Sequence, residues 1–202
     1  MRFDACQSRE QVLREIIYLT LVGIILIAIP TVAAARRMTE AVKEFYRIAD
    51  SERQSGVDCC ARAVTYVSGL PGDTREAVAR AIAFDDDWRI GCIGVSFLLE
   101  GGSTDDAVAP LAKMIGRGEE ECLSRVLRSL VHSDDETTYL RVLIAVNRYL
   151  LAHLESYAGT QRAFVQQFLS GGGIEKPTTP FSRRDVERRI SEWEARLRNR
   201  SR

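Results

Sequence analysis

The sequence predicts an all-α protein with one membrane-spanning helix near the N-terminus, a six-helix bundle, and a separate basic amphipathic helix at the C-terminus. Apolar residues recur at helical spacing along most of the chain, and Ser, Asp and Glu stand where helix caps are expected. The five prolines are too few to punctuate an all-β fold. The expected boundaries are 1–37 for the N-terminal segment and anchor, 38–169 for the bundle, 170–181 for a flexible linker and 182–202 for the last helix.

The longest apolar stretch covers residues 16–35, "IIYLTLVGIILIAIPTVAAA", and has no charged side chain. A helix of this length reaches about 30 Å, the thickness of the hydrocarbon core of a bilayer. A cleaved signal peptide would use the small residues at 33–35, but the apolar run is longer than such peptides need. A buried core helix would normally show a polar face. We therefore expect a retained single-pass anchor, with membrane lipid as its partner.

Charges and cysteines indicate on which side of the membrane the bundle lies. Basic residues flank the apolar stretch, three before it and four after it: Arg2, Arg9, Arg14, and Arg36, Arg37, Lys43, Arg47. The positive-inside rule then favours a cytoplasmic bundle anchored in the plasma (inner) membrane. The five cysteines include an adjacent pair and are odd in number, which is not the pattern of a disulfide framework.

After the anchor, residues 36–55 mix charges at helical spacing and are expected to form a helix that Gly56 interrupts. Apolar residues between 57 and 67 follow the i, i+3, i+4, i+7 template of an amphipathic helix. The run "SGLPGD" ends that helix. Asp73 and Glu76 stand at capping-box spacing and predict the start of the next one.

Residues 90–99 form an uncharged segment that is too short to cross a bilayer. Its β-branched residues and glycines would also suit a strand. We interpret it as a buried central helix, opened by the aspartates at 85–87 and closed by the glycines at 101–102. Ser103 and Asp106 repeat the capping-box spacing and predict a further helix, which the glycines at 116 and 118 end.

Two more helices are predicted before the linker. The glutamates at 119–121 open one of them, since acidic side chains favour the positive end of a helix dipole. Ser133 and Glu136 form a third capping box, and the leucines after it mark one face of a long helix that is expected to run on to residue 169. Residues 72–81 and 102–111 resemble each other, which indicates either an internal repeat or two helix starts that are alike by chance.

The linker "SGGGIEKPTTP" leads to a helix with an apolar seam at 4, 3 and 4 spacing. Residues 183–202 hold eight arginines and four acids. We expect this helix to bind anionic lipid or a protein partner through Arg183, Arg184, Arg188, Arg189 and Trp193. The alternative is a solvated tail helix without a specific task.

No part of the sequence has the pattern of a catalytic site. The two histidines, His132 and His153, stand in no motif of a nucleophile with its base, and their helical positions favour structural roles. No glycine-rich phosphate loop is present, and helix capping explains the acidic clusters. With 28 basic and 28 acidic residues, the chain has no bias toward nucleic acid. We expect no enzyme activity, no cofactor, no metal and no nucleic-acid partner.

Three stretches carry a resemblance to a known family: "FYRIADSERQSGVDCCARAV" (45–64), "LLEGGSTDDAVAPLA" (98–112) and "LSRVLRSLVHSDDETTYLRVLIAVNRYL" (123–150). They resemble the cytoplasmic helical domain of type II secretion and archaellum/pilus platform membrane proteins. In the second stretch, a glycine is followed six residues later by Ala107 and an aliphatic residue, as in that family. The chain lacks the family's later membrane helices and its hairpin glycine, which favours a single-domain paralogue or accessory subunit.

The resemblance implies a non-catalytic scaffold that docks on a hexameric assembly ATPase and on platform subunits. Acid-rich helix starts would be the docking residues: Asp85, Asp86, Asp87, Asp134, Asp135 and Glu136. Reversing these charges would then weaken ATPase capture without unfolding the domain. The alternative function is a membrane-anchored helical adaptor or regulator of another membrane complex. An enzyme that uses His132 or an acidic cluster is the third reading.

Overall fold

The computed structural model describes residues 36–55, 60–132, 136–171 and 180–200, and all regular elements in them are helical. The all-α prediction is therefore confirmed for this part of the chain. Residues 36–54 form one helix. The elements that follow are α2 (Ala61–Ser68), α3 (Gly72–Ile82), α4 (Trp88–Glu100), α5 (Thr104–Arg117), α6 (Glu120–His132), α7 (Glu136–Ala152), the 3-10 helix η1 (Leu154–Ser156), α8 (Gly159–Gly171) and α9 (Arg183–Arg200).

The chain divides into two compact units, residues 1–44 and 45–202. In the first unit, the described residues 36–44 are helical and carry an ion pair between Lys43 and Glu40, with an Nζ–Oε1 distance of 3.3 Å. The predicted anchor, 16–35, lies outside the described residues. Among the helices that are described, none has both the length and the apolar character that crossing a membrane requires.

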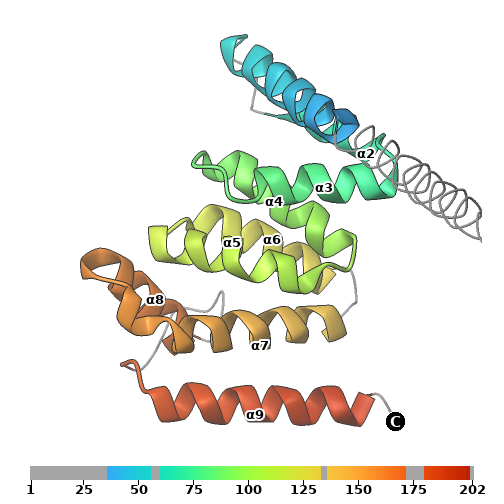
Figure 1. The fold of residues 1–202 in the computed structure, drawn as a ribbon. Coiled ribbons are helices and arrows are strands. Elements are labelled where there is room, and N and C mark those ends of the chain that lie inside the picture. Colours follow the sequence, from blue (N-terminus) through green and yellow to red (C-terminus); the bar gives the residue numbers. More distant parts are fainter. Residues whose placement is uncertain (1–35, 56–59, 133–135, 172–179, 201–202) are drawn as a thin grey trace, which may run out of the picture. The chain divides into compact units, whose positions relative to one another are not determined.

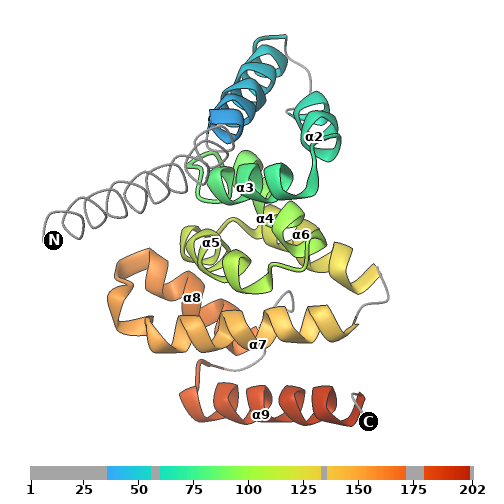
Figure 2. The same cartoon turned by 45° about the vertical axis from the view of Figure 1, so that its right-hand side comes forward.

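Helices α3 to α9 of the second unit form a stack in which packing links helices that are near each other in the chain. α3 packs on α4, α4 on α5 and α6, α5 on α7 and α8, and α7 on α9. In both Figure 1 and Figure 2, α3, α5, α7 and α9 follow one another in this order. Such packing between neighbours is typical of helical solenoids, in which each helical pair buries its apolar face against the next pair.

Helix α4 is the buried central helix that the sequence predicts. Its N-cap is Asp87, whose Oδ1 accepts a hydrogen bond from the Arg89 backbone nitrogen at 3.0 Å. At its end Gly102 adopts a positive φ of 78°, and the Ser103 nitrogen donates to the Leu98 carbonyl at 2.8 Å. This is a Schellman turn, which requires a residue that tolerates the left-handed region. Most of the α4 side chains between these ends are buried.

Two of the predicted capping boxes do not form. Helix α3 begins at Gly72 with no side-chain cap, and Asp73 lies inside its first turn. Ser103 is the N-cap residue of α5, but its hydroxyl donates to the Glu76 carboxylate of α3 instead of capping α5. Asp106 accepts a hydrogen bond from Arg80, with an Nε–Oδ2 distance of 2.7 Å. Side chains of the expected boxes therefore bind partners on the neighbouring helix, and neither helix start receives a side-chain cap.

The long helix expected to run to residue 169 is broken in the structure. Helix α7 ends at Ala152, η1 follows, and α8 begins at Gly159 with a positive φ of 52°. The Ser156 hydroxyl donates to the His153 carbonyl at 2.6 Å, a local bond that competes with helix continuation. Leu154 is buried in this turn. Its apolar character therefore reflected burial and not the face of a continuing helix.

The cysteines differ in their state. Cys92 and Cys122 are buried free thiols on helices, as the sequence predicts for most of the five. Cys60 is also buried, but it is disulfide-bonded. Because disulfides persist mainly in oxidising compartments, the cysteine argument for a cytoplasmic bundle loses support, and the membrane side stays a prediction.

Candidate binding groove

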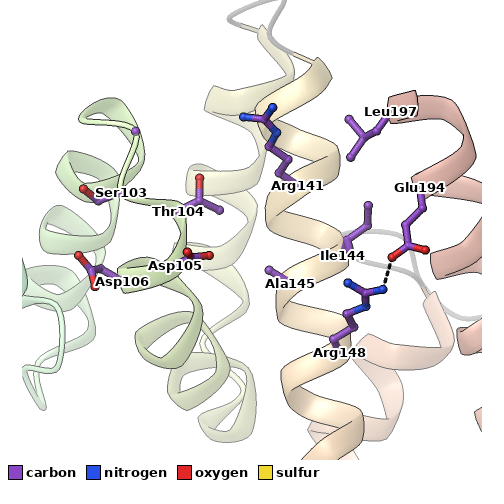
Figure 3. A pocket seen from close by; sticks show the side chains of 11 residues that line it. Ser103, Thr104, Asp105, Asp106, Arg141, Ile144, Ala145, Arg148, Glu194 and Leu197 are labelled. Carbon is purple, nitrogen blue, oxygen red and sulfur yellow. Dashed lines mark hydrogen bonds and ion pairs between the residues drawn. The ribbon is translucent and has the colours of Figure 1, made fainter. Parts of the chain in front are cut away.

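An open groove of about 700 Å³ lies between the start of α5, the middle of α7 and the second half of α9 (Figure 3). The residues that line it are Gly102, Ser103, Thr104, Asp105, Asp106, Arg141, Ile144, Ala145, Arg148, Glu194 and Leu197. Three elements that are far apart in the sequence thus meet at one surface, because the stack places α5 and α9 against α7.

The first turn of α5 makes an acidic wall. Arg80 of α3 holds it in place, since its guanidinium binds Asp106 at 2.7 Å and Glu76 at 2.6 Å. The Ser103 hydroxyl donates to the same Glu76 carboxylate. Asp105 is exposed, forms no ion pair with the described residues, and points toward α7 in Figure 3. One carboxylate of this wall is therefore anchored and the other is available.

Helix α7 makes a basic wall from Arg141 and Arg148, which stand two helical turns apart on one face. Arg148 forms an ion pair with Glu194 of α9, drawn as a dashed line in Figure 3. Arg141 is exposed and forms no ion pair with the part of the chain that is described. Ile144 and Ala145 lie between the two arginines and supply an apolar floor.

This arrangement suits binding better than catalysis. The carboxylate of Asp105 on α5 and the guanidinium of Arg141 on α7 both line the groove and have no ion pair with the described residues, so a segment with complementary charges would fit in it. No histidine or cysteine lines the groove, and the Ser103 hydroxyl already has an acceptor. A nucleophile with its base is thus not assembled among these lining residues.

The aspartates at 85–87, predicted as docking residues, each bind a different part of the fold. Asp85 Oδ2 accepts a hydrogen bond from the Tyr46 hydroxyl at 2.5 Å. Asp86 Oδ1 binds Arg117 at 2.7 Å and Lys113 at 3.2 Å, both from α5.

Asp87 caps α4 and forms an ion pair with Arg53. The aspartates at 85–87 therefore join α4 to α5 and to the helix over 36–54. The carboxylate of Asp86 stays exposed, but reversing all three charges would break these bonds. The charge reversal expected to spare the fold is thus not a clean test of docking.

These contacts shift the pKa values of two of the carboxyl groups and of the Tyr46 hydroxyl. Hydrogen bonds from Arg117 and Lys113 hold the pKa of Asp86 below its usual value. Burial of Asp87 opposes its ionisation, but the hydrogen bonds from Arg89 and the charge of Arg53 together keep its pKa low. Burial and the hydrogen bond to Asp85 raise the pKa of the Tyr46 hydroxyl.

The second predicted docking cluster is described only in part. Asp134 and Asp135 lie outside the described residues. Glu136 begins α7 and forms ion pairs with Arg196, at 2.6 Å, and with Arg200 of α9. Its carboxylate thus helps to hold α9 against α7.

The basic C-terminal helix is not separate, because α9 packs on α7 within the same compact unit. Val186 and Ile190 of its apolar seam are buried, which leaves that seam unavailable to a lipid surface. The seam itself explains why α9 packs on α7, since a narrow apolar stripe is stabilised by packing on any complementary helix.

Several arginines of α9 bind the ends of neighbouring helices. Arg183 donates to the Leu151 carbonyl at the end of α7, at 3.2 Å. Arg189 donates to the Leu169 and Ser170 carbonyls at the end of α8, and its guanidinium lies 5.4 Å from the centre of the Trp193 ring. Cations at helix C-termini are favoured by the helix dipole.

The remaining predicted arginines of α9 face outward. Arg184 is exposed, and Arg188 is exposed and pairs with Asp185 of the same helix at 3.2 Å. Contact of these two residues with lipid or a partner stays a prediction.

Of the two histidines, only the side chain of His153 is described, and its contacts are with the preceding turn, in α7. His153 is exposed, stacks on Tyr149 with ring centres 4.2 Å apart, and has Nδ1 2.8 Å from the Tyr149 carbonyl oxygen. This agrees with the structural role expected for it. The side chain of His132 lies outside what is described. No group of three or more His, Cys, Asp and Glu side chains in the described residues could hold a metal ion.

No protein-family model, no curated protein and no solved structure matches the chain. The groove is therefore interpreted from its own residues. Sequence reasoning missed four of its five charged residues, Asp105, Arg141, Arg148 and Glu194. The spacing of the two arginines along α7 was a signal for a common face, but only the packing of α9 shows that this face borders a groove.

Proposed function

We propose that the chain is a non-catalytic, membrane-anchored helical docking protein and that a partner binds in the groove between α5, α7 and α9. The observation that carries the proposal is an open groove of about 700 Å³ that is lined by two charges of opposite sign from different helices, Asp105 and Arg141, neither of which has an ion pair with the described residues. Stacked helices commonly present such extended surfaces to protein partners. The anchor is supported by the apolar residues 16–35.

The partner segment is defined by the two walls. A basic side chain on one side would pair with Asp105, an acidic side chain on the other would pair with Arg141, and a small apolar group would cover Ile144 and Ala145. Pairs at the rim of a groove act mainly on association rate and specificity. We therefore expect charge reversals to weaken binding without abolishing the fold, because neither Asp105 nor Arg141 has an internal partner among the described residues.

The machine we propose for this protein is a secretion or pilus/archaellum-type assembly system, with a hexameric ATPase and platform subunits as partners. The support is the sequence resemblance over residues 45–64, 98–112 and 123–150. A membrane-anchored adaptor of another complex is the alternative, and the same groove would serve it.

Site-specific photo-crosslinking in intact membranes tests the proposal. A crosslinker at Ala145 in the groove is compared with one at Arg125, an exposed position on α6. We expect a partner to be captured from Ala145 and not from Arg125, and the variants Arg141→Glu and Asp105→Lys to reduce its yield. Equal crosslinking from both positions would rule out the groove as the binding site. A crosslinking yield that stays the same in both charge-reversal variants would do so as well.

The identity of the captured protein distinguishes the two proposed functions. An assembly ATPase or platform subunit supports the secretion-type system, and another membrane protein supports the adaptor. Protease protection of the bundle in intact spheroplasts tests the proposed side of the membrane. Digestion from outside would rule out a cytoplasmic ATPase as the partner.

A further inference from the structure

Three sulfur atoms meet where α4, α5 and α6 pack together. Cys122 Sγ of α6 lies 3.3 Å from Met114 Sδ of α5. Cys92 Sγ of α4 lies 3.8 Å from the Cys122 carbonyl oxygen. All three side chains are buried, and both cysteines are free. The whole chain has only five cysteines and three methionines, so three of its eight sulfur-containing residues lie in this cluster.

We propose that Cys92, Cys122 and Met114 form a binding site for a soft monovalent metal ion of the copper(I) class. Thiolate and thioether sulfur are the ligands that such an ion selects, whereas carboxylate and carbonyl oxygen suit harder ions. No aspartate, glutamate or histidine belongs to this cluster. Three sulfur donors from three different helices can surround one ion in a plane.

The distance of 3.3 Å between Cys122 Sγ and Met114 Sδ is close to what the ion needs. With metal–sulfur bonds of about 2.3 Å, as for zinc thiolates, three sulfurs around an ion in a plane stand about 4 Å apart. Met114 and Cys122 would therefore separate by less than about 1 Å. The methionine side chain is flexible enough for such a movement. Met114 Cε packs directly against Gly91, where a Cβ would lie only 2.8 Å from it.

Binding of the ion conserves charge through the release of protons. Binding of one copper(I) releases two thiol protons to solvent, and the resulting site carries one net negative charge.

The test uses the full chain, purified in detergent and reduced without oxygen. Copper(I) is titrated against a coloured copper(I) chelator, and X-ray absorption counts the sulfur neighbours. Alkylation followed by peptide mass spectrometry then reports each cysteine separately, which distinguishes this site from copper bound at Cys6, Cys59 or Cys60. We expect copper to protect both Cys92 and Cys122, with three sulfurs around the ion.

Variants complete the test. Cys92→Ser and Cys122→Ser should lose the protected site, and Cys6→Ser should keep it. Met114→Leu conserves volume and should leave the fold intact, which circular dichroism checks. It should reduce the count of sulfur neighbours from three to two and weaken retention against the chelator. Copper that leaves Cys92 and Cys122 as reactive as in the metal-free chain would overturn the proposal. So would a disulfide between them on copper addition, or an unchanged sulfur count in Met114→Leu.

Discussion

Gly94 of α4 lies so close to Ala83 at the end of α3 that a Cβ at position 94 would stand 2.6 Å from the Ala83 nitrogen. The contact joins the central buried helix to the helix before it, which is the most extensive helix pairing in the stack. The atoms that a Cβ would meet belong to the backbone and cannot rotate away. A glycine is therefore required here by close approach, although its φ is ordinary.

Gly94→Ala should destabilise the protein. In an exposed helix this change would gain about 1 kcal/mol of helix propensity, but here the forced shift of α3 should lower the free energy of unfolding by about 1–3 kcal/mol. Chemical denaturation measures it. Gly72→Ala is the matched control, because nothing lies within 4 Å of a Cβ there. A Gly94→Ala variant as stable as the parent would contradict the close approach.

Glu52 should stabilise α2 from a distance. Its buried carboxylate accepts hydrogen bonds from the backbone nitrogens of Arg62, at 2.8 Å, and Ala63, at 3.2 Å, in the first turn of that helix. Glu52→Ala leaves both donors without this acceptor and should cost about 1–3 kcal/mol.

Hydrogen exchange provides a local measurement, since the amides of Arg62 and Ala63 should exchange faster in Glu52→Ala. The exposed pair of Glu121 with Arg125 gives the control, and Glu121→Ala should change stability by less than about 1 kcal/mol. If the two variants were equally stable, the hydrogen bonds from the first turn of α2 to Glu52 would not contribute to the free energy of unfolding.

Acid should weaken the protein partly through Asp86 and Asp87. The pKa of each carboxyl is lower in the folded state than the value of about 3.9 in an unfolded chain. Their stabilisation is therefore present above about pH 4 and is lost as the pH falls through the folded pKa values.

The double variant Asp86→Asn/Asp87→Asn should flatten this dependence, measured as the urea midpoint at pH 7 and at pH 3. Asparagine still caps α4, so local helix formation is preserved. Asp105→Asn is the matched control for the loss of a carboxylate, since Asp105 is exposed and has no ion pair with the described residues. A double variant with an unchanged slope would show that these contacts do not matter for folding.

Helix α9 should unfold together with the rest of the second unit. Ile190 is buried against its neighbours, and Ile190→Ala should lower the free energy of unfolding by about 2–4 kcal/mol. Arg198→Ala, at an exposed position of the same helix, should change it by less than about 0.5 kcal/mol. A silent Ile190→Ala variant would mean that α9 is a detached tail after all.

Much of the local structure was predictable because the responsible signals lie within a few residues of each other. The uncharged run at 90–99 with aspartates before it and a glycine pair after it correctly predicted the buried helix α4. The break at 153–158 was missed because a buried leucine in a turn looks like one more member of a helical face. The capping-box prediction at Ser103 failed because Glu76 of another helix accepts its hydroxyl.

By itself, the sequence determined the all-α class of the described residues, the burial of α4 and the apolar seam of α9. Helical periodicity and glycine turns encode these properties over short range. Only the tertiary structure decided where that seam packs and which charges are left free. Arg148 and Glu194 are 46 residues apart, and Ser103 and Glu76 are 27 apart. Such partners depend on how the helices stack, and the spacing of residues along the chain does not predict this stacking.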